Sequence, residues 1–183
     1  MQTRLNVYSF FEIHILYHNF KNIGGLYMKT TIQAIKSILL PVLTGLLAGL
    51  LISNNTDMYN VLIKPPFALP GSLFPVVWTV LYILMGVAFF LFQTSGANEK
   101  DLNDGKLFFY TQLFFNFLWP IVFFNFKLPF TAFILLVILF VFTAITVVKF
   151  YQSSKLSGIL LLPYLLYILY AGYLNFAIWF LNL

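Results

Sequence analysis

Five long apolar segments, separated by short polar connections, dominate the chain. Each covers roughly 20 residues, which is the length that an α-helix needs to cross a hydrocarbon core about 30 Å thick. Apolar and polar positions do not alternate with a period of two, so the pattern favours helices over the strands of a membrane barrel. Spanning helices are predicted at about residues 32–52, 73–92, 107–126, 129–148 and 159–180.

These segments predict an all-α, polytopic membrane protein whose membrane domain is a five-transmembrane-helix bundle. We assign residues 28–183 to this domain. Residues 1–27 lack the apolar core and the small-residue cleavage site of a signal peptide. Because Met28 is an equally natural start, we interpret residues 1–27 as an N-terminal extension that is either not native or disordered.

The stretch 59–82, which joins the first two segments, holds four of the eight prolines. Proline removes a backbone donor and disfavours helix at the preceding residue, so Pro65 to Pro70 should form a loop. A helix can begin near Leu73, because Pro75 is tolerated in a first helical turn. The aromatic residues expected around one mouth of the bundle are Tyr59, Phe67, Phe74 and Trp78.

Composition and charge agree with a membrane protein and give it an orientation. The chain is 61% hydrophobic and 8% charged, whereas a soluble domain is about 25% charged. Its net charge of +5 suits anionic lipid headgroups better than nucleic acid. Six lysines flank the segments on the N-terminal side and two on the other, and positive charge is retained inside. The lysines therefore predict a cytoplasmic N-terminus, an outer proline-rich loop and an outer C-terminus. The membrane itself is expected to be a bacterial cell membrane.

Several kinds of chemistry are disfavoured by missing residue types. The chain has no cysteine, which excludes a disulfide framework, a thiolate metal site and a cysteine nucleophile. Apart from Lys36, the five segments hold no Asp, Glu, Lys, Arg or His, although proton relays and ion pathways usually need such groups. We therefore expect a binding protein that requires no cofactor, and neither an enzyme with catalytic residues nor an ion-coupled transporter.

Polar and aromatic side chains recur at helical spacing in three of the segments. In the third segment they are separated by 4, 3 and 4 residues, which places them on one helix face: Gln112, Asn116, Trp119 and Phe123. The amides either join helices through hydrogen bonds or line a pocket. The matching faces of the second and fifth segments, which either pack or line the same pocket, hold Trp78, Tyr82, Met85 and Phe89, and Tyr164, Tyr167, Ala171, Leu174 and Ile178.

Two glycines give the first segment a GxxxG pattern. Gly45 and Gly49 remove side chains from one helix face, so a neighbouring helix can approach closely. That neighbour is either a helix of the same chain or a second copy of the protein.

Four motifs follow one another along the loop and the spans. They are Tyr59-x-x-Leu62-x-Lys64-Pro65, Phe74-Pro75-Val76-Val77-Trp78-Thr79-x-Leu81-Tyr82, Gln112-Leu113-x-x-Asn116-x-x-Trp119 and Leu162-Pro163-Tyr164-Leu165, followed by Ala171, Leu174-Asn175, Trp179 and Asn182. In this order they resemble the tryptophan-rich sensory protein and translocator (peripheral benzodiazepine receptor) family, TspO/MBR. The resemblance runs from about residue 38 to residue 182.

The resemblance implies a five-helix bundle, commonly a homodimer, with a ligand pocket under the loop between the first two helices. Family ligands are porphyrins, sterol-like molecules and synthetic benzodiazepine-type compounds. Carried over by position and joined to the aromatic stripes above, the expected ligand-binding residues are Tyr59, Phe67, Pro70, Trp78, Tyr82, Asn116, Trp119, Phe123, Tyr167, Ala171 and Leu174.

Four positions depart from the family pattern. Met58 and Phe67 stand where the family usually has tryptophan, Gly71 replaces a second proline, and Tyr167 replaces a tryptophan. Phe67 and Tyr167 keep an aromatic ring, so a flat apolar ligand should still stack. Chemistry that needs the easily oxidised indole is not expected to carry over.

Together these features favour a membrane receptor for flat hydrophobic molecules, which senses, sequesters or moves tetrapyrroles. Protoporphyrin IX or haem is the expected ligand, with membrane lipid and a second copy of the chain as further partners. Two alternatives stay open, namely a light-dependent porphyrin-degrading enzyme and a transporter of porphyrin or sterol.

Overall fold

The computed structural model of the protein describes residues 28–183. The chain divides into two compact units, residues 1–36 and residues 37–183. The described part of the first unit, residues 28–36, is helical. The second unit holds the helical bundle. The interpretation of residues 1–27 as an extension lies outside the described residues.

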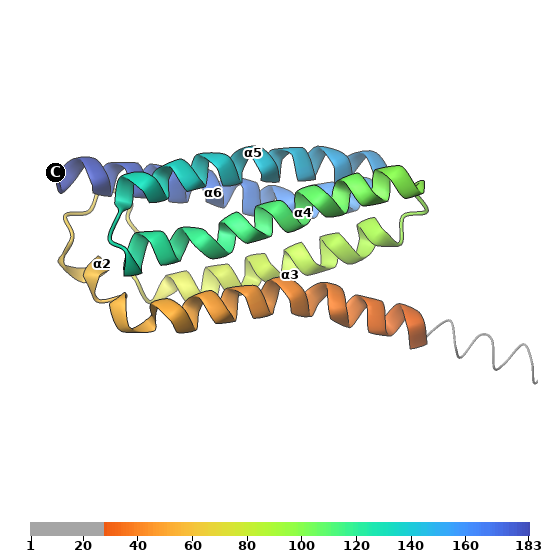
Figure 1. Ribbon diagram of the computed structural model, residues 1–183, viewed down its shortest axis with the longest axis horizontal. Coiled ribbons are helices and arrows are strands. Elements are labelled where there is room, and N and C mark those ends of the chain that lie inside the picture. Colours follow the sequence, from red (N-terminus) through yellow and green to blue (C-terminus); the bar gives the residue numbers. More distant parts are fainter. Residues whose placement is uncertain (1–27) are drawn as a thin grey trace, which may run out of the picture. The chain divides into compact units, whose positions relative to one another are not determined.

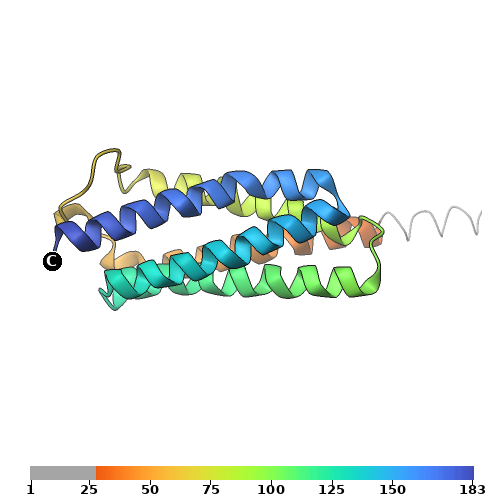
Figure 2. The same ribbon diagram turned by 90° about the horizontal axis from the view of Figure 1, so that it is seen from above.

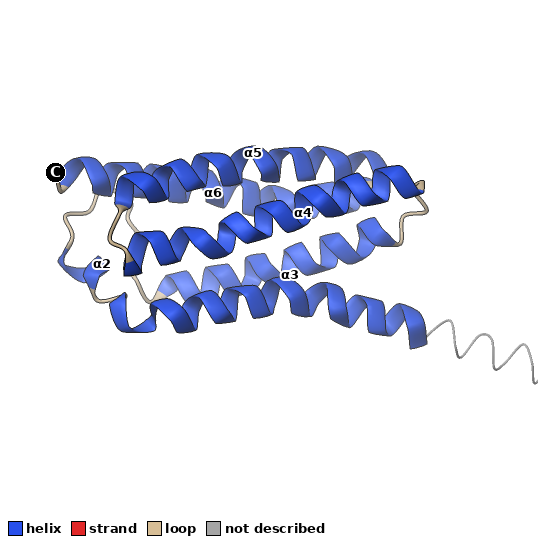
Figure 3. Cartoon of the chain, viewed as in Figure 1, coloured by secondary structure: helices blue, strands red, loops and turns tan. Residues whose placement is uncertain are grey.

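The described chain is helical, with five helices long and apolar enough to cross a membrane, and no strand occurs in residues 28–183 (Figures 1 and 3). The prediction of a five-span, all-α membrane protein is confirmed. The spans are Met28–Asn55, whose last turn is η1 (Ser53–Asn55), α3 (Leu73–Gln93), α4 (Glu99–Pro120) continued by η2 (Ile121–Asn125), α5 (Pro129–Ser153) and α6 (Lys155–Leu181). A short helix, α2 (Met58–Val61), precedes the proline-rich loop.

The helices extend beyond the predicted apolar segments, most of all at the start of α4. This helix begins at Glu99, whereas the apolar pattern predicted a start at residue 107. The Asn98 side chain caps it by accepting a hydrogen bond from the Asp101 amide at 2.9 Å. Two acidic residues in the first turn also favour the positive end of the helix dipole. Hydropathy detects only the apolar part of a helix. The predicted start was therefore too late, because the first turns of α4 are polar.

Within the second unit, α5 packs against both α4 and α6, and α6 also packs against α3 (Figure 2). The connection between η2 and α5 is a tight turn in which Lys127 adopts a φ of 54°. The Leu128 amide donates to the Val122 carbonyl at 3.2 Å. The third and fourth spans, which this tight turn joins, are therefore antiparallel neighbours.

Glycines bring the first span close to α3. A Cβ atom placed on Gly45 would fall on the ring of Tyr82, and one placed on Gly86 would fall on the backbone of Ile38. In contrast, no described atom lies within 4 Å of a Cβ placed on Gly49. Of the two glycines in the GxxxG pattern, Gly45 therefore serves packing within the chain.

The half of the bundle away from the loop is filled by phenylalanine rings. Phe89 stacks on Phe109 and Phe92 stacks on Phe150, each with 4.1 Å between ring centroids. Gly105 of α4 leaves the space that the Phe92 ring occupies. Offset-stacked aromatic pairs are favourable contacts, so these rings stabilise the packing of α3, α4 and α5 in this half of the bundle.

Candidate ligand-binding site

The proline-rich segment is a loop, as predicted, and α3 begins at Leu73. After α2 the backbone turns extended at Leu62, with φ −72° and ψ 144°. Phe67 then adopts a positive φ of 63°, which is uncommon for a residue with a bulky side chain. Its side chain is 88% exposed. Phe67 thus lies apart from the other residues expected at the mouth.

Side chains of α6 and of Asn182, the residue that follows the helix, hold this loop in place. The Tyr170 hydroxyl donates to the Phe67 carbonyl at 2.8 Å and accepts from the Leu69 amide at 3.1 Å. The Asn182 side chain binds both backbone groups of Ile63, accepting from its amide at 2.9 Å and donating to its carbonyl at 3.0 Å. Because buried or bound backbone groups need such partners, the loop conformation depends on α6.

Tyr59 lies beneath the loop and is only 5% exposed. Its hydroxyl donates to the Leu69 carbonyl at 2.9 Å. Its ring packs edge-on against Phe74, with centroids 5.3 Å apart, and the Lys64 ammonium lies 5.0 Å from its centroid. Burial raises the pKa of the Tyr59 hydroxyl, and the nearby Tyr170 raises it further. Tyr59 therefore stays protonated and able to donate at neutral pH.

Trp78 lies at the centre of a group of aromatic rings from α3, α4 and α6. Ring centroids of Tyr82, Trp119, Tyr164 and Tyr167 lie 5.5, 6.0, 6.2 and 5.3 Å from that of Trp78. Tyr164 and Tyr167 present their edges to the indole, at interplanar angles of 68° and 89°. We call these five residues the tryptophan cluster. It offers aromatic faces and phenol hydroxyls, and no charged group.

A network of buried hydrogen bonds joins the cluster to α4. The Tyr82 hydroxyl donates to Asn116 Oδ1 at 2.6 Å, and Asn116 Nδ2 donates to the Tyr164 hydroxyl at 2.9 Å. That hydroxyl donates in turn to Gln112 Oε1 at 2.8 Å. Asn116 and Gln112 are each 1% exposed. The amides therefore join three helices, while their partners Tyr82 and Tyr164 belong to the aromatic cluster.

Trp119 connects the cluster to a second apolar group nearer the loop. Its indole Nε1 donates to Asn175 Oδ1 at 2.9 Å, and Asn175 Nδ2 donates to the Pro129 carbonyl at 2.6 Å. The Phe123 ring lies 6.3 Å from Trp119 and is almost fully buried. Phe123 and Tyr59 belong to the same apolar group. Trp119 is thus fixed in orientation by a hydrogen bond as well as by packing.

The structure brings most of the predicted residues together. Ala171 and Leu174 are buried on α6, and Ala171 belongs to the apolar core that contains the tryptophan cluster. Pro70, like Phe67, is exposed on the loop. Those gathered at or next to the cluster are Tyr82, Trp78, Asn116, Trp119, Tyr167 and Ala171.

Residues that hold the loop were not predicted. Tyr164, Tyr167, Tyr170 and Tyr173 recur every third residue, and each such step falls short of a full turn by about 60°. The row therefore winds around α6, from the fully buried Tyr164 to the exposed Tyr173, whose hydroxyl donates to the Pro66 carbonyl at 3.0 Å. This period-three row is the sequence signal that could have revealed the loop contacts.

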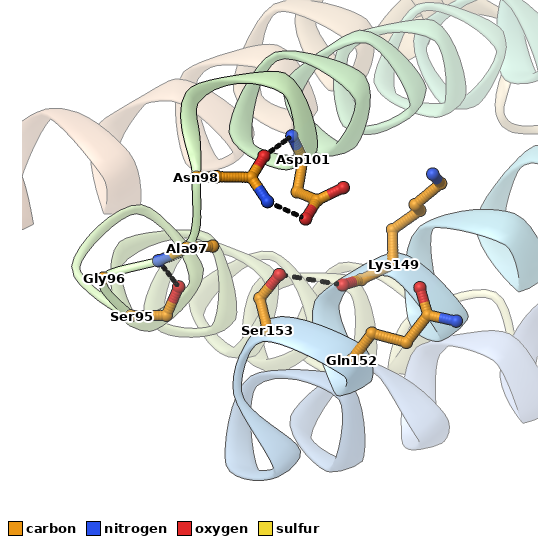
Figure 4. A pocket seen from close by; sticks show the side chains of 8 residues that line it. All are labelled: Ser95, Gly96, Ala97, Asn98, Asp101, Lys149, Gln152 and Ser153. Carbon is orange, nitrogen blue, oxygen red and sulfur yellow. Dashed lines mark hydrogen bonds between the residues drawn. The ribbon is translucent and has the colours of Figure 1, made fainter.

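A separate hollow of about 300 Å³ lies at the opposite ends of the helices, between the α3–α4 connection and the end of α5 (Figure 4). Its lining is polar: Asn98 Nδ2 donates to the Asp101 carboxylate at 2.6 Å, and the Ser153 hydroxyl donates to the Lys149 carbonyl at 3.3 Å. The Lys149 ammonium is paired with Asp104 at 3.3 Å. These groups satisfy one another and provide no apolar face for a flat ligand.

Known proteins resemble this chain over most of its length. The TspO/MBR family model matches residues 37–180. The "Tryptophan-rich protein TspO" of Chlorobaculum tepidum is 38% identical over 124 residues, which cover 68% of this chain and 78% of that protein. The protein of the same name from Archaeoglobus fulgidus is 42% identical over 120 residues, covering 65% and 76%. The human "Translocator protein" is 34% identical over 124 residues, covering 66% and 72%. With the family match extending over residues 37–180 of 183, this integral membrane protein belongs to the TspO/MBR family.

Proposed function

We propose that the protein binds porphyrin-like, flat hydrophobic molecules at the tryptophan cluster, beneath the proline-rich loop. The observation that carries the proposal is the position of Trp78, whose half-buried ring lies between 5.3 and 6.2 Å from four other aromatic rings of α3, α4 and α6. Binding sites for such ligands are mostly apolar, with a few placed polar groups that set orientation.

The chemistry of the cluster favours a flat apolar guest. Trp and Tyr rings offer large faces for stacking, and their polar ends can still make hydrogen bonds. The rings pack against one another, so a ligand must separate Trp78 from neighbours such as Tyr167. The loop that would have to move is held by side-chain hydrogen bonds to α6 rather than by secondary structure. Ligand entry therefore requires that these rings separate and that the hydrogen bonds of the loop break.

The proposed role is to sense, sequester or move tetrapyrroles, with protoporphyrin IX or haem as ligand and no required cofactor. Relatives of the chain are named as tryptophan-rich, sensory and translocator proteins. A sterol-like ligand presents a similar rigid apolar body. Efflux from loaded vesicles separates movement across the membrane from storage.

A second candidate function is light-dependent breakdown of a bound porphyrin. It is favoured by one observation: the indole rings of Trp78 and Trp119 lie 6.0 Å apart within the cluster. Tyr167 stands where the family usually has a third indole, and phenol is harder to oxidise. If breakdown occurs, Tyr167→Trp should raise its rate under illumination in air more than it raises porphyrin affinity. Product analysis that shows rapid breakdown by the unmodified protein, insensitive to Tyr167→Phe, would replace the binding role with an enzymatic one.

The binding proposal is tested by a ligand screen on the purified protein, with protoporphyrin IX, haem and a sterol, followed by quenching of tryptophan emission. Tyr59→Ala should weaken porphyrin binding about tenfold, or roughly 1.4 kcal/mol, because it removes the ring beneath the loop. The matched control is Tyr110→Ala on α4, whose side chain is 49% exposed and should not change affinity. If none of the three ligands binds, the proposed function is wrong.

A further inference from the structure

The hydroxyl of Tyr167 has no hydrogen-bond partner among the described residues, although it is buried. The Tyr167 ring is in contact with both Trp78, at 5.3 Å between centroids, and Tyr170, at 5.6 Å. Its hydroxyl therefore lies where the tryptophan cluster meets the residues that hold the loop. A buried polar group without a partner is uncommon in folded proteins and costs stability.

The tyrosines around it have already used their donor hydrogens. Tyr59 donates to Leu69 and Tyr170 donates to Phe67, both on the loop. In the cluster, the Tyr82 hydroxyl donates to Asn116 and the Tyr164 hydroxyl to Gln112. Of the five hydroxyls gathered here, only that of Tyr167 keeps a donor hydrogen that no described residue accepts.

We propose that Tyr167 is a specificity-determining residue, whose hydroxyl donates a hydrogen bond to an acceptor on the edge of the bound ligand. This inference rests on the proposed function and names the ligand class more narrowly: a flat apolar molecule that carries a carboxylate or carbonyl group on one edge. The ligand acceptor pairs with a donor that has no partner in the free protein. Binding therefore recovers the free energy that is lost when the Tyr167 hydroxyl is buried without a hydrogen bond.

The charge near the loop makes a carboxylate the preferred acceptor. The Lys64 ammonium lies 5.0 Å from the centroid of the Tyr59 ring. The hydroxyls of Tyr59 and Tyr170 both bind the backbone of Leu69, and the Tyr170 ring lies 5.6 Å from that of Tyr167. Lys64 donates to the carbonyls of Asn60 and Leu62 at 3.2 and 3.3 Å, which leaves one of its three N–H donors uncommitted. Hydrogen bonds with an ionised partner are roughly twice as strong as neutral ones.

The neighbours of Tyr167 favour one orientation of the ligand. Its apolar body would lie against Trp78, and its acceptor edge would lie at the Tyr167 hydroxyl, near Tyr170 and the loop. A ligand with carboxylates on one edge and alkyl groups elsewhere matches this arrangement, and a porphyrin with two neighbouring propionates has that shape.

The test compares two porphyrins that share a macrocycle, protoporphyrin IX with its two carboxylates and etioporphyrin with alkyl groups only. Binding to the full chain is followed by the shift of the porphyrin absorption band, for the unmodified protein and for Tyr167→Phe. We expect Tyr167→Phe to weaken protoporphyrin IX binding roughly tenfold and to leave etioporphyrin binding unchanged. If the substitution affects both porphyrins equally, or neither of them while both bind, the role of Tyr167 is wrong and the binding function stands.

A measurement without ligand tests the premise separately. Because its hydroxyl lacks a partner, Tyr167→Phe should unfold at the same temperature as the unmodified protein or at a higher one. Tyr170→Phe is the matched control, since it removes a hydroxyl with two loop hydrogen bonds and should unfold at a lower temperature. A clear loss of stability in Tyr167→Phe would show that its hydroxyl is already satisfied and would overturn the inference. If neither porphyrin binds the unmodified protein, the proposed function and this inference fall together.

Discussion

The side chain of Asn116 bridges α3 and α6 from within α4, through Tyr82 and Tyr164. Asn116→Leu leaves both hydroxyls short of a partner and should lower the free energy of unfolding by about 1–2 kcal/mol. Thermal unfolding in detergent measures the change. The matched control is Thr111→Val, because the Thr111 hydroxyl bonds only within its own helix, to the Leu107 carbonyl at 2.8 Å.

The same variant separates two roles of Asn116. Lower stability with unchanged porphyrin affinity would assign the residue to joining helices alone. A fall in both would add it to the ligand site. Unchanged stability in Asn116→Leu would contradict the hydrogen-bond network itself.

Gly45 and Gly49 allow a comparison of two similar substitutions in one helix. Gly45→Ala places a methyl group on the Tyr82 ring and should lower the free energy of unfolding by about 1–3 kcal/mol. Gly49→Ala meets open space and should be neutral or stabilising by up to about 1 kcal/mol, because alanine favours helix. Thermal unfolding measures both changes. If the two variants lost the same stability, Gly45 would have no special role in packing within the chain.

At the scale of residues, the sequence predicted which residues belong to the site, but not which side chains pair with one another. Helical spacing placed Trp78 and Tyr82 on one face of α3, and the structure places both in the tryptophan cluster. The pairing of Asn116 with Tyr82 and Tyr164 depends on how three helices pack, which spacing within one helix does not determine. Phe67 was expected with the other aromatic rings, but its positive φ and 88% exposure set it apart.

At the scale of elements, the loop before α3 depends on hydrogen bonds from α6. Asn182→Leu removes both bonds to Ile63, so the loop should open more often while the bundle stays folded. Hydrogen exchange of the backbone amides in residues 63–69 should become roughly tenfold faster. Asn103→Ala, at an exposed position of α4, is the control. Unchanged exchange in Asn182→Leu would show that other contacts hold the loop.

The boundaries of the elements could be predicted only in part. The prolines predicted the loop and the start of α3 correctly, because proline restricts only its own backbone and that of the preceding residue. The apolar pattern predicted the end of the third span at residue 126, within one residue of the observed end at Asn125. It did not predict the form of the last turn: the helix passes Pro120 and widens into the π-helical turn η2, where the Phe126 amide donates to the Ile121 carbonyl. This turn places Asn125 so that its side chain bonds with Asn55 at 2.9 Å and with the Leu51 carbonyl at 3.0 Å. Such contacts depend on tertiary structure.

At the scale of the whole molecule, the distribution of lysines predicts the orientation of the bundle. Lys100, Lys106, Lys149 and Lys155 flank the helix ends away from the proline-rich loop, and Lys64 and Lys127 lie at the loop end. Positive charge is retained in the cytoplasm. Reporter fusions after residue 183 should therefore read as outside, and fusions near residue 100 as cytoplasmic. The reverse pattern would place the loop and the ligand site entrance inside.

The central claim is that a flat apolar ligand binds against Trp78. The most direct measurement is the affinity for protoporphyrin IX, followed by porphyrin absorbance, in Trp78→Leu and in Trp179→Leu. Trp179 packs against Phe130 and Phe176, with ring centroids 4.7 and 5.5 Å away, and is not in the tryptophan cluster. We predict that Trp78→Leu weakens binding at least about tenfold, while Trp179→Leu stays within about twofold of the unmodified protein. Equal affinities in the two variants would contradict the account.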